Sequence, residues 1–357
     1  MTIFLGCYTD EAHANGLKAL ELDADSGRLS VVAERPVSNA IYQALSPDGK
    51  YLYSCTGEGL ASFRAEGLEP LDSLLLGNCV CYVAAMQDGR HAVFADYLGG
   101  FAGSVEVENG RFGKVVKHRH SGSGPNLPRQ SAAHCHQAIP TPDGKGYCVV
   151  DLGLDQIVEY PSGRVFRTSP AGAGPRHLVF HPNGRLAFLV CELGNLVLSL
   201  SWNVEAGFTL LDTQSTLIDL SHKEHKGHKV TSASLRLCVE NSNQDKSSIA
   251  AAIRFTPDMR GIVVSNRGED SLVVFDFDES TGKLTFKART MPTGNWPRDF
   301  IFVSDSLALV ACEHSGEVQG LKYEKDTGMF KTIATLKGLF RPVSLLAGTE
   351  LLAEKVR

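Results

Sequence analysis

The residues of this sequence best suited to chemistry are one histidine, two arginines and one glutamate: His136, Arg176, Glu192 and Arg267. An imidazole titrates close to neutral pH and can therefore take or give a proton during a reaction. A planar guanidinium matches the oxygens of a carboxylate or a phosphate. Together these residue types predict proton transfer on an anionic substrate, but they are far apart in the chain and need a fold that brings them together.

A recurring turn indicates which elements position these residues. The turn reads Pro-Asp-Gly or a close variant, and it lies between short runs of β-forming residues such as Tyr51–Tyr53 and Ile262–Val264. Proline presets such a turn, Asp or Asn caps it and Gly supplies a positive φ, so each copy predicts a hairpin. The copies are Ser46–Lys50, Gln87–Arg90, Thr141–Lys145, His181–Arg185, Thr256–Arg260 and the degenerate Val303–Ser306.

The spacing of these turns identifies the fold. Their Asp or Asn residues recur about every 40 to 55 residues, close to the length of a four-stranded propeller blade, except for one gap of about 75 residues. That gap holds either one blade with an insertion, for which the polar stretch Asp219–Ser248 is a candidate, or two blades with a lost turn. The strand-like segments Ile3–Cys7 and Val343–Leu352 can complete one more blade together. We therefore predict an all-β fold, a single seven-bladed β-propeller domain over residues 1–357, closed by N- and C-terminal strands in one blade.

Counting from each turn places the polar residues within the repeat. The residues seven positions before the turn Asp or Asn, and those nine positions after it, lie at the end of the hairpin opposite the turn. If the first strand of each hairpin is the innermost, these positions form a ring at one mouth of the central channel. The first set is Ile41, Cys81, His136, Arg176, Ala251 and Arg298, the second is Gly57, Tyr97, Leu152, Glu192, Arg267 and His314, and the immediate neighbours include Gln137, Asp151, His177, Asn266 and Glu313.

The charged members of this ring come from the last four hairpins, whereas the first two hairpins contribute neutral residues. Several cations around one carboxylate favour an anion-binding site. The alternative is that the mouth of a propeller is exposed to solvent, where polar residues at strand ends are common without a function. Arg176 and Glu192 would then form an ion pair that only bridges neighbouring strands. The turn count alone leaves both interpretations open.

The same segments resemble the lactonase family of seven-bladed propellers, which includes propeller-type 6-phosphogluconolactonases and carboxy-cis,cis-muconate cyclases. The resemblance covers nearly the whole chain, and its most specific motif is Gly-Pro-Arg-His with a glutamate sixteen residues after the arginine. In the muconate cyclases the proposed site is one His, two Arg and one Glu, which the resemblance transfers to His136, Arg176, Glu192 and Arg267. The matching segments are Gly6–Thr9, His134–Gln137, Asp151–Asp155, Gly174–Gly184, Cys191–Leu193, Ser265–Ser271 and Trp296–Phe300.

The resemblance implies a hydrolase of carbohydrate metabolism that opens a sugar lactone, with 6-phosphogluconolactone as the first candidate. His136 or Glu192 would act as the base, and Arg176 and Arg267 would hold the carbonyl oxygen or the substrate anion. The scheme needs no metal or other cofactor. The substrate-binding candidates that go with it are Gln137, Asp151, His177 and Arg298, the last two for a terminal phosphate.

Two other functions stay open. The same residues could close an unsaturated dicarboxylate into a lactone, because arginines would bind the two carboxylates and His or Glu would move the proton. The chain could also be a non-catalytic propeller that serves as a scaffold for other proteins. No tryptophan-aspartate signature recurs in the repeats, which argues against the commonest scaffold type.

Composition narrows the range of partners. A formal net charge of −5 gives no broad cationic surface, so we expect no nucleic-acid partner. No apolar run reaches the roughly 20 residues of a membrane span, and the first residues lack the features of a secretory signal. The 9 cysteines are scattered and form no CxxC pair, which indicates a reducing compartment and no zinc site. We expect a cytoplasmic monomer or weak dimer that acts on a small lactone or anionic sugar.

Two further motifs carry little weight. His222, His225 and His228 have a metal-like spacing but lie in a Lys-rich polar stretch, so we expect a solvated loop rather than a metal site. Ser121–Asn126 contains glycines but lacks the Lys-Ser/Thr of a phosphate-binding loop. We expect it to be a lid or an inter-strand loop near His134–His136.

Overall fold

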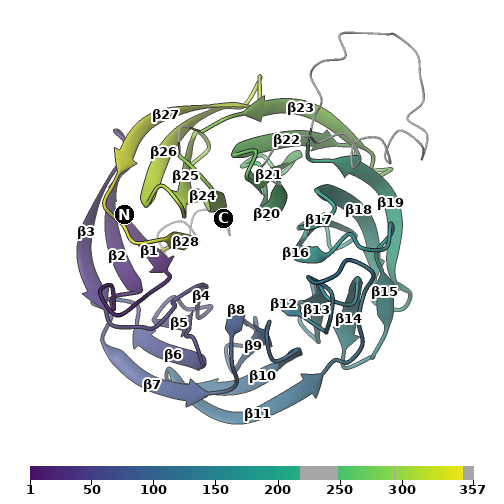
Figure 1. Cartoon of the computed structure of the whole chain (residues 1–357), viewed down its shortest axis with the longest axis horizontal. Coiled ribbons are helices and arrows are strands. Elements are labelled where there is room, and N and C mark those ends of the chain that lie inside the picture. Colours follow the sequence, from purple (N-terminus) through teal and green to yellow (C-terminus); the bar gives the residue numbers. More distant parts are fainter. Residues whose placement is uncertain (218–247, 293, 349–357) are drawn as a thin grey trace.

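The computed structural model describes residues 1–217, 248–292 and 294–348, and these form seven four-stranded antiparallel sheets around a central axis (Figure 1). The sheets are the blades of a β-propeller, and no α-helix occurs among the described residues. The predicted all-β, seven-bladed fold is therefore confirmed. The first strand of each predicted hairpin is the innermost of its blade, which is the condition that the ring of polar residues requires.

Each blade takes four strands, and six of the seven blades use consecutive strands of the chain. From the axis outward, the strands are β28 (Pro342–Ala347), β1 (Thr2–Cys7), β2 (Leu17–Asp23) and β3 (Arg28–Arg35); β4 (Gln43–Leu45), β5 (Tyr51–Cys55), β6 (Gly59–Arg64) and β7 (Pro70–Leu75); β8 (Val80–Ala85), β9 (His91–Asp96), β10 (Phe101–Glu108) and β11 (Arg111–Arg119); β12 (Cys135–Pro140), β13 (Tyr147–Asp151), β14 (Gln156–Tyr160) and β15 (Val165–Arg167); β16 (Pro175–Phe180), β17 (Leu186–Cys191), β18 (Leu196–Asn203) and β19 (Gly207–Ser215); β20 (Ile249–Phe255), β21 (Gly261–Arg267), β22 (Ser271–Phe277) and β23 (Leu284–Thr290); and β24 (Pro297–Phe302), β25 (Leu307–Cys312), β26 (Glu317–Glu324) and β27 (Met329–Leu336).

One blade joins the beginning and the end of the described chain. β28 pairs antiparallel with β1, with Leu345 opposite Leu5 and Leu346 opposite Phe4. Leu5 and Leu345 are buried in the same apolar cluster, so the pairing is held by side-chain packing as well as by the backbone. The predicted closure of the propeller is confirmed.

In the described part of the long gap between turns, the strands belong to the blade of β16 to β19 and, from β20 on, to the next blade, so no extra blade occurs there. The insertion predicted at Asp219–Ser248 falls almost wholly outside the described residues, and so do His222, His225 and His228. Ser121–Asn126 lies in the connection between β11 and β12, as predicted for an inter-strand loop.

The turns form for the reasons that their residue types suggest. In the first copy Ser46 Oγ donates to Asp48 Oδ1 at 2.6 Å, and the same oxygen accepts the backbone N–H of Lys50 at 3.2 Å. Gly49 has a φ of 70°, in the region that favours glycine. The copy that has Met259 at this place adopts a φ of 57° and keeps the same side-chain cap. Capping by Asp therefore holds the turn even where glycine is missing.

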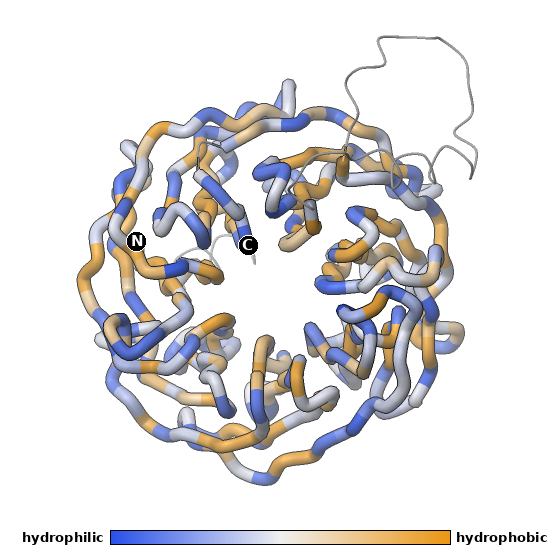
Figure 2. Tube along the Cα trace, in the orientation of Figure 1, coloured by the Kyte–Doolittle hydropathy of each residue, from blue (hydrophilic) through white to orange (hydrophobic). Residues whose placement is uncertain are grey.

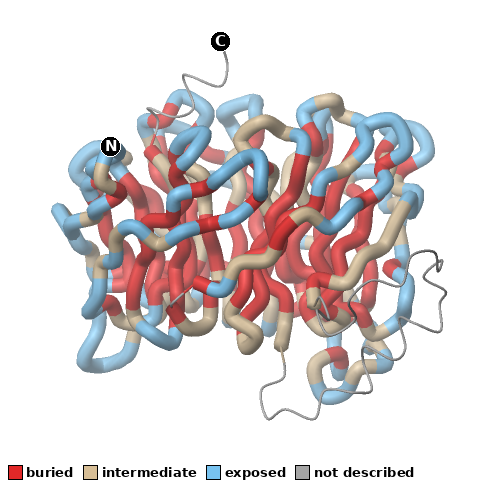
Figure 3. Tube along the Cα trace, turned by 90° about the horizontal axis from the view of Figure 1, so that it is seen from above, coloured by how far each residue is buried: buried red, intermediate tan, exposed pale blue. Residues whose placement is uncertain are grey.

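Apolar side chains fill the space between neighbouring blades. Strands near the axis, such as β17, are buried along their whole length, whereas outermost strands such as β3 alternate between exposed and half-buried residues. Figure 2 shows apolar residues in every blade, and Figure 3 shows the buried residues as a central layer with exposed connections on both faces. Residues that project from this layer toward the axis are therefore carried by a rigid, close-packed frame.

Within these described ranges we find no helix with the length and hydropathy needed to span a bilayer. The cysteines in the same ranges form no disulfide.

Candidate active site

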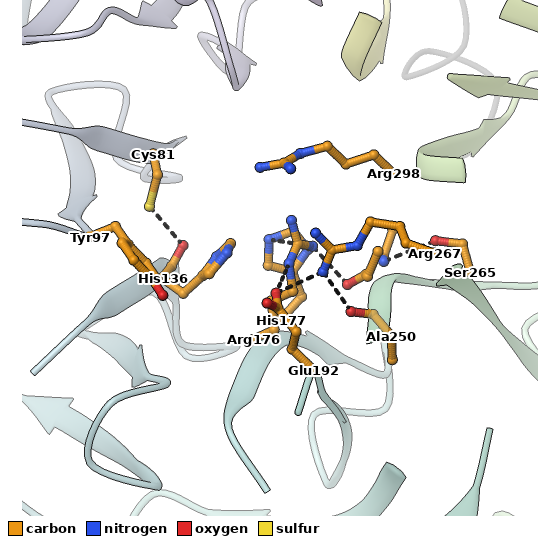
Figure 4. A network of polar contacts seen from close by, with 12 residues as sticks. Cys81, Tyr97, His136, Arg176, His177, Glu192, Ala250, Ser265, Arg267 and Arg298 are labelled. Carbon is orange, nitrogen blue, oxygen red and sulfur yellow. Dashed lines mark hydrogen bonds and ion pairs between the residues drawn. The ribbon is translucent and has the colours of Figure 1, made fainter. Parts of the chain in front are cut away.

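A β-bulge at the start of the inner strands directs the ring residues. In β12, β16 and β24 the register shifts at His136, Arg176 and Arg298, so each of these is the extra residue of a bulge. Cys81 occupies the same place in β8. A bulge takes its extra side chain out of the regular alternation of the strand and is common beside active sites. Figure 4 shows that these four side chains point toward one another.

A cavity on the propeller axis receives these side chains. Its walls come from the innermost segments of six blades, so it lies where the blades converge. Neutral side chains from the first blades face arginines from the later ones across it. The cavity is lined by Ile41, Tyr42, Cys81, His136, Arg176, His177, Arg298, Asp299 and Val343.

Glu192 directly follows β17 and gathers three guanidiniums, those of Arg129, Arg176 and Arg267; we call these four residues the Glu192 cluster. Its Oε2 lies 3.0 Å from Arg176 Nε and 2.8 Å from Arg267 Nη2. Its Oε1 lies 2.6 Å from Nη2 of Arg129, which comes from the connection between β11 and β12. The structure therefore brings three of the four predicted catalytic residues into direct contact.

Backbone carbonyls fix the two buried arginines of this cluster. Arg176 Nη1 donates to the carbonyl of Ala251 at 2.7 Å, and Arg267 Nη2 donates to the carbonyl of Ala250 at 2.9 Å. Both carbonyls belong to the irregular start of β20, where the pairing with β21 is interrupted between Ala250 and Ile253. The blade whose ring position holds an alanine thus contributes backbone acceptors in place of a polar side chain.

The electrostatics of the Glu192 cluster follow from burial and proximity. Burial opposes the charge on Glu192, but the guanidiniums of Arg267 and Arg176 outweigh it and hold the pKa of this carboxyl well below its usual range. Burial, followed by the neighbouring guanidinium of Arg267, lowers the pKa of Arg176 to about 9. Glu192 is therefore ionised at neutral pH with both oxygens bound to cations, which makes it a poor proton acceptor.

His136 stands beside this cluster with one nitrogen unused. The residue is 8% exposed, and its Nδ1 is buried without a hydrogen-bond partner among the described residues. The ring meets Tyr97 and His177 edge to face, at centroid distances of 5.6 and 5.2 Å. Burial, followed by the guanidinium of Arg176, lowers the pKa of His136 well below its usual value. The imidazole is therefore neutral and can exchange a proton at the cavity.

His177 lines the same cavity from a more enclosed position. Its ring meets the rings of Tyr42 and Tyr82 edge to face, at 5.9 and 5.4 Å. Burial, followed by the guanidinium of Arg176, lowers the pKa of His177 well below its usual value. Since His177 is neutral, Arg298 is the stronger of the two predicted phosphate ligands.

A second group of charges surrounds Glu313, which directly follows β25. Glu313 Oε2 lies 3.1 Å from Arg298 Nη1, and Oε1 accepts from Arg341 Nε at 3.1 Å. Both guanidiniums lie over the ring of Tyr8, at 5.2 Å for Arg298 and 4.3 Å for Arg341. We call Glu313, Arg298, Arg341 and Tyr8 the Glu313 cluster. Burial opposes the charge on Arg298, but Tyr8 and Glu313 outweigh the effect of burial and raise the pKa of the guanidinium. Arg298 is therefore positively charged at neutral pH.

The turn count was wrong by one residue in the last hairpin. It placed His314 in the ring, whereas the structure places Glu313 there, because Glu313 follows β25 as Glu192 follows β17 and the two hairpins have the same register. The degenerate turn is shorter than the others, which shifts every position after it. His314 instead stacks on Trp296 with ring centroids 4.4 Å apart.

Two predicted substrate-binding residues do not line the cavity. Gln137 Nε2 donates to the carbonyl of Leu178 at 3.1 Å, and its Oε1 accepts the Leu178 N–H at 2.6 Å, so its amide ties two blades together. Asp151 accepts the backbone N–H of His134 at 2.9 Å and lies 2.7 Å from His120 Nδ1. The hydrogen bonds of both side chains support the blades rather than the cavity.

One group of potential metal ligands occurs among the described residues. His120, Cys135 and Asp151 place their ligand atoms within 4.8 Å of one another. Both ring nitrogens of His120 are engaged, however, since Nδ1 lies beside Asp151 and Nε2 lies 3.1 Å from the hydroxyl of Tyr160. The group is a buried hydrogen-bonded tie between strands.

Sequence reasoning missed three arginines near the cavity. Arg129 and Arg341 come from the connections before β12 and β28, outside the count from the turns. Arg254 lies in β20 and its Nη2 donates to Asp299 Oδ1 at 2.8 Å. A signal existed for Arg129, because it follows the glycine-containing stretch that was predicted to lie near His134–His136. Nothing in the repeat pointed to the other two.

Comparisons with known proteins identify relatives of this chain. The profile of the family described as "Lactonase, 7-bladed beta-propeller" matches residues 2–344. A protein named 6-phosphogluconolactonase from Bacillus subtilis (strain 168) is 30% identical over 359 aligned residues, which cover 95% of this chain and 96% of the relative. A solved structure described as a putative 6-phosphogluconolactonase from Bacteroides fragilis NCTC 9343 has a TM-score of 0.79 and 25% identity over 97% of both chains. The periplasmic gluconolactonase PpgL of Pseudomonas aeruginosa shares the fold, with a TM-score of 0.83 and 24% identity over 97% of this chain and 98% of its own.

Proposed function

Because the chain belongs to the lactonase family of seven-bladed β-propellers, we propose that it hydrolyses a sugar lactone, 6-phosphogluconolactone, at one mouth of its central channel. The observation that carries the proposal is the neutral His136, which has an unpartnered Nδ1 and lines a cavity together with Arg176 and Arg298. A proton acceptor and fixed cations around one cavity are what the opening of an anionic lactone requires. The names of the Bacillus subtilis and Bacteroides fragilis relatives support the choice of substrate.

In the proposed reaction a water molecule adds to the lactone carbonyl while His136 accepts one of its protons. The carbonyl oxygen becomes an oxyanion as the new C–O bond forms. When this intermediate collapses, the ring C–O bond breaks and His136 returns the proton to the leaving alkoxide oxygen. The product is the open-chain hydroxy acid, and water is the sole co-reactant.

The contacts of Glu192 favour His136 as the base. Both oxygens of Glu192 are paired with guanidiniums, so neither is available to accept a proton from water. His136 is neutral and has a nitrogen without a protein partner. In this proposal Glu192 holds the arginines in place rather than moving a proton.

Arg176 is the arginine best placed to stabilise the oxyanion. It lines the cavity, and its guanidinium is fixed by Glu192 and by the carbonyl of Ala251, so little reorganisation is needed when charge develops. Arg267 shares the same carboxylate oxygen of Glu192 and supports Arg176 from the neighbouring blade. Arg298 is then available for the charged end of the substrate.

Two alanine variants test the proposal. His136→Ala should lower kcat on 6-phosphogluconolactone by about a hundredfold, the usual range for an acid–base group. Arg267→Ala should lower kcat by about as much, because Arg176, which faces the oxyanion, loses the support of its neighbour on Glu192. Matched controls are His91→Ala, which removes a surface hydrogen bond to Asp88, and Arg64→Ala, which removes a surface ion pair with Glu69. Such surface pairs contribute little, so kcat of the controls should stay within about twofold of the wild type. Unchanged turnover in both site variants would exclude this site.

Lactone-forming cyclisation is the second candidate function, because a cavity rich in guanidiniums also suits a dicarboxylate. The direct test offers the wild-type protein 6-phosphogluconolactone and carboxy-cis,cis-muconate in parallel. Turnover of the muconate alone would replace the hydrolase proposal by the cyclase. A cytoplasmic location stays a prediction, since one structural neighbour is described as periplasmic, and so does a monomeric or weakly dimeric state.

A further inference from the structure

The Glu313 cluster repeats the plan of the Glu192 cluster on another blade. In both blades an arginine occupies the bulge of the inner strand, and a glutamate that directly follows the second strand binds this arginine. The pairs are Arg176 with Glu192 and Arg298 with Glu313. The cavity therefore has two cationic walls, and the chemistry proposed above uses one of them.

The arginine from the bulge is more exposed in the second wall than in the first, and so is the second arginine bound to the same glutamate when Arg341 is compared with Arg267. The side chains of Arg298 and Arg341 are 19% and 48% exposed, whereas those of Arg176 and Arg267 are 4% and 5% exposed. Tyr8 gives the two open guanidiniums a common aromatic platform. A guanidinium that already meets water can exchange that water for the oxygens of a ligand without first leaving a buried ion pair.

The Glu313 cluster also carries more positive than negative charge. Two guanidiniums share one carboxylate, and each oxygen of Glu313 already has its arginine. Among the described residues, the Arg298 side chain donates one hydrogen bond, from Nη1 to Glu313 Oε2. Figure 4 shows Arg298 reaching toward the space that His136 and Arg267 also face. An anionic group next to the reacting lactone would therefore meet the remaining N–H donors of two guanidiniums that Glu313 and Tyr8 hold in place.

We infer that the Glu313 cluster binds the phosphoryl group of the substrate, with Arg298 and Arg341 as its ligands, and that Arg341 determines the preference for phosphorylated over neutral lactones. The inference rests on the proposed function, because the lactone carbonyl then lies at His136 and Arg176. Phosphoryl oxygens accept several charge-assisted hydrogen bonds at once, so they can share both guanidiniums with Glu313.

The test compares two lactones that differ in one phosphoryl group. For Arg341→Gln, kcat/KM on 6-phosphogluconolactone should fall about tenfold, mainly through KM, because one charge-assisted contact in a half-exposed site is lost. On glucono-δ-lactone, which lacks the phosphoryl group, kcat/KM should stay within about twofold of the wild type. Inorganic phosphate should inhibit the wild type competitively, and its inhibition constant should rise about tenfold in the variant. Arg64→Gln, at a surface ion pair with Glu69, is the matched control and should change none of these values.

The possible outcomes separate the inference from the proposed function. Equal loss on both lactones, or no loss on either, would overturn the inference while lactonase activity stands. A wild type that opens neither lactone would instead reject the proposed function and the inference with it. Tyr8→Leu is a second variant should Arg341→Gln fold poorly: it keeps both arginines and removes their platform, so KM should rise about threefold for the phosphorylated lactone alone.

Discussion

The two arginine–glutamate pairs of this propeller occupy equivalent places in their blades, yet their surroundings differ. Both glutamates are nearly inaccessible, with Glu192 and Glu313 each 2% exposed. The difference lies in the arginines. Those bound to Glu192 through its Oε2 are sealed, whereas Arg298 and Arg341 on Glu313 reach solvent.

This difference shows how one structural plan can serve two purposes. Charges that are sealed cannot relax when the charge of a substrate changes, so they provide a fixed field, which is what stabilisation of a transition state needs. Charges at the edge of water can change partners, which suits recognition of a charged substituent. If burial, rather than position in the repeat, decides what a pair does, changes at the two pairs should have unequal effects.

The largest expected effect is on stability, from removing each carboxylate in turn. Glu192→Gln leaves Arg176 and Arg267 buried without a counter-charge, and loss of one partner of a buried pair costs about 3–5 kcal/mol of the free energy of unfolding. Glu313→Gln leaves Arg298 and Arg341 able to hydrate, so the loss should be about 1 kcal/mol. Urea unfolding at pH 7 compares the two variants with the wild type.

Each of these variants is the control for the other, since glutamine preserves the size of the side chain in both. Equal destabilisation would mean that the exposure of the arginines has no bearing on the strength of the pair. The activity of Glu192→Gln should also fall much further than that of Glu313→Gln, because Arg176 loses the group that fixes it.

A smaller effect is expected from pH, because two buried histidines adjoin the Glu192 cluster. His136 and His177 have lowered pKa values in the folded protein, mainly through burial, whereas an unfolded histidine titrates near 6.5. Below about pH 6.5 these two histidines therefore bind protons in the unfolded chain but stay neutral in the folded chain. The stabilisation is complete above pH 6.5, and each histidine removes about 1.4 kcal/mol per pH unit as the pH falls further.

Unfolding measured between pH 7 and pH 5 tests this dependence. His136→Asn should make the slope of unfolding free energy against pH shallower by about 1.4 kcal/mol per pH unit below pH 6.5. His91→Asn, at an exposed position beside Asp88, is the control. A slope in His136→Asn as steep as in the wild type would show that folding does not lower the pKa of His136.

The sequence allowed the ring of polar residues and six of the blades to be predicted from one repeated turn, and the seventh blade with its closure from the strand-like segments Ile3–Cys7 and Val343–Leu352. The bulges could not be predicted, because they arise from the pairing between strands, and the number of residues between successive turns does not show them. The bulged residues His136 and Arg176 line the cavity, whereas the amide of Gln137 is hydrogen-bonded to Leu178 in the neighbouring blade. The shorter last turn explains why His314 was placed where Glu313 lies.

Arg129 escaped prediction because it reaches the site from a connection, where no repeat fixes the count. Its side chain is 41% exposed, although its Nη2 lies 2.6 Å from Oε1 of the buried Glu192. Arg129 thus belongs to the Glu192 cluster by its contact but resembles the arginines of the Glu313 cluster in its exposure. It also donates to the hydroxyl of Tyr97 at 3.3 Å. If exposure decides the role of an arginine, Arg129 belongs functionally with Arg341 rather than with Arg267.

Arg129→Gln should therefore have the smallest effect of those considered. The loss in unfolding free energy should be below about 1 kcal/mol, as for other ion pairs with an exposed partner, and kcat should fall less than about tenfold. Arg267→Ala, with its sealed guanidinium on the same carboxylate, supplies the opposite extreme in the same assays. A loss of kcat in Arg129→Gln as deep as in Arg267→Ala would break the link between burial and catalysis, because an accessible guanidinium would then contribute as much as a sealed one.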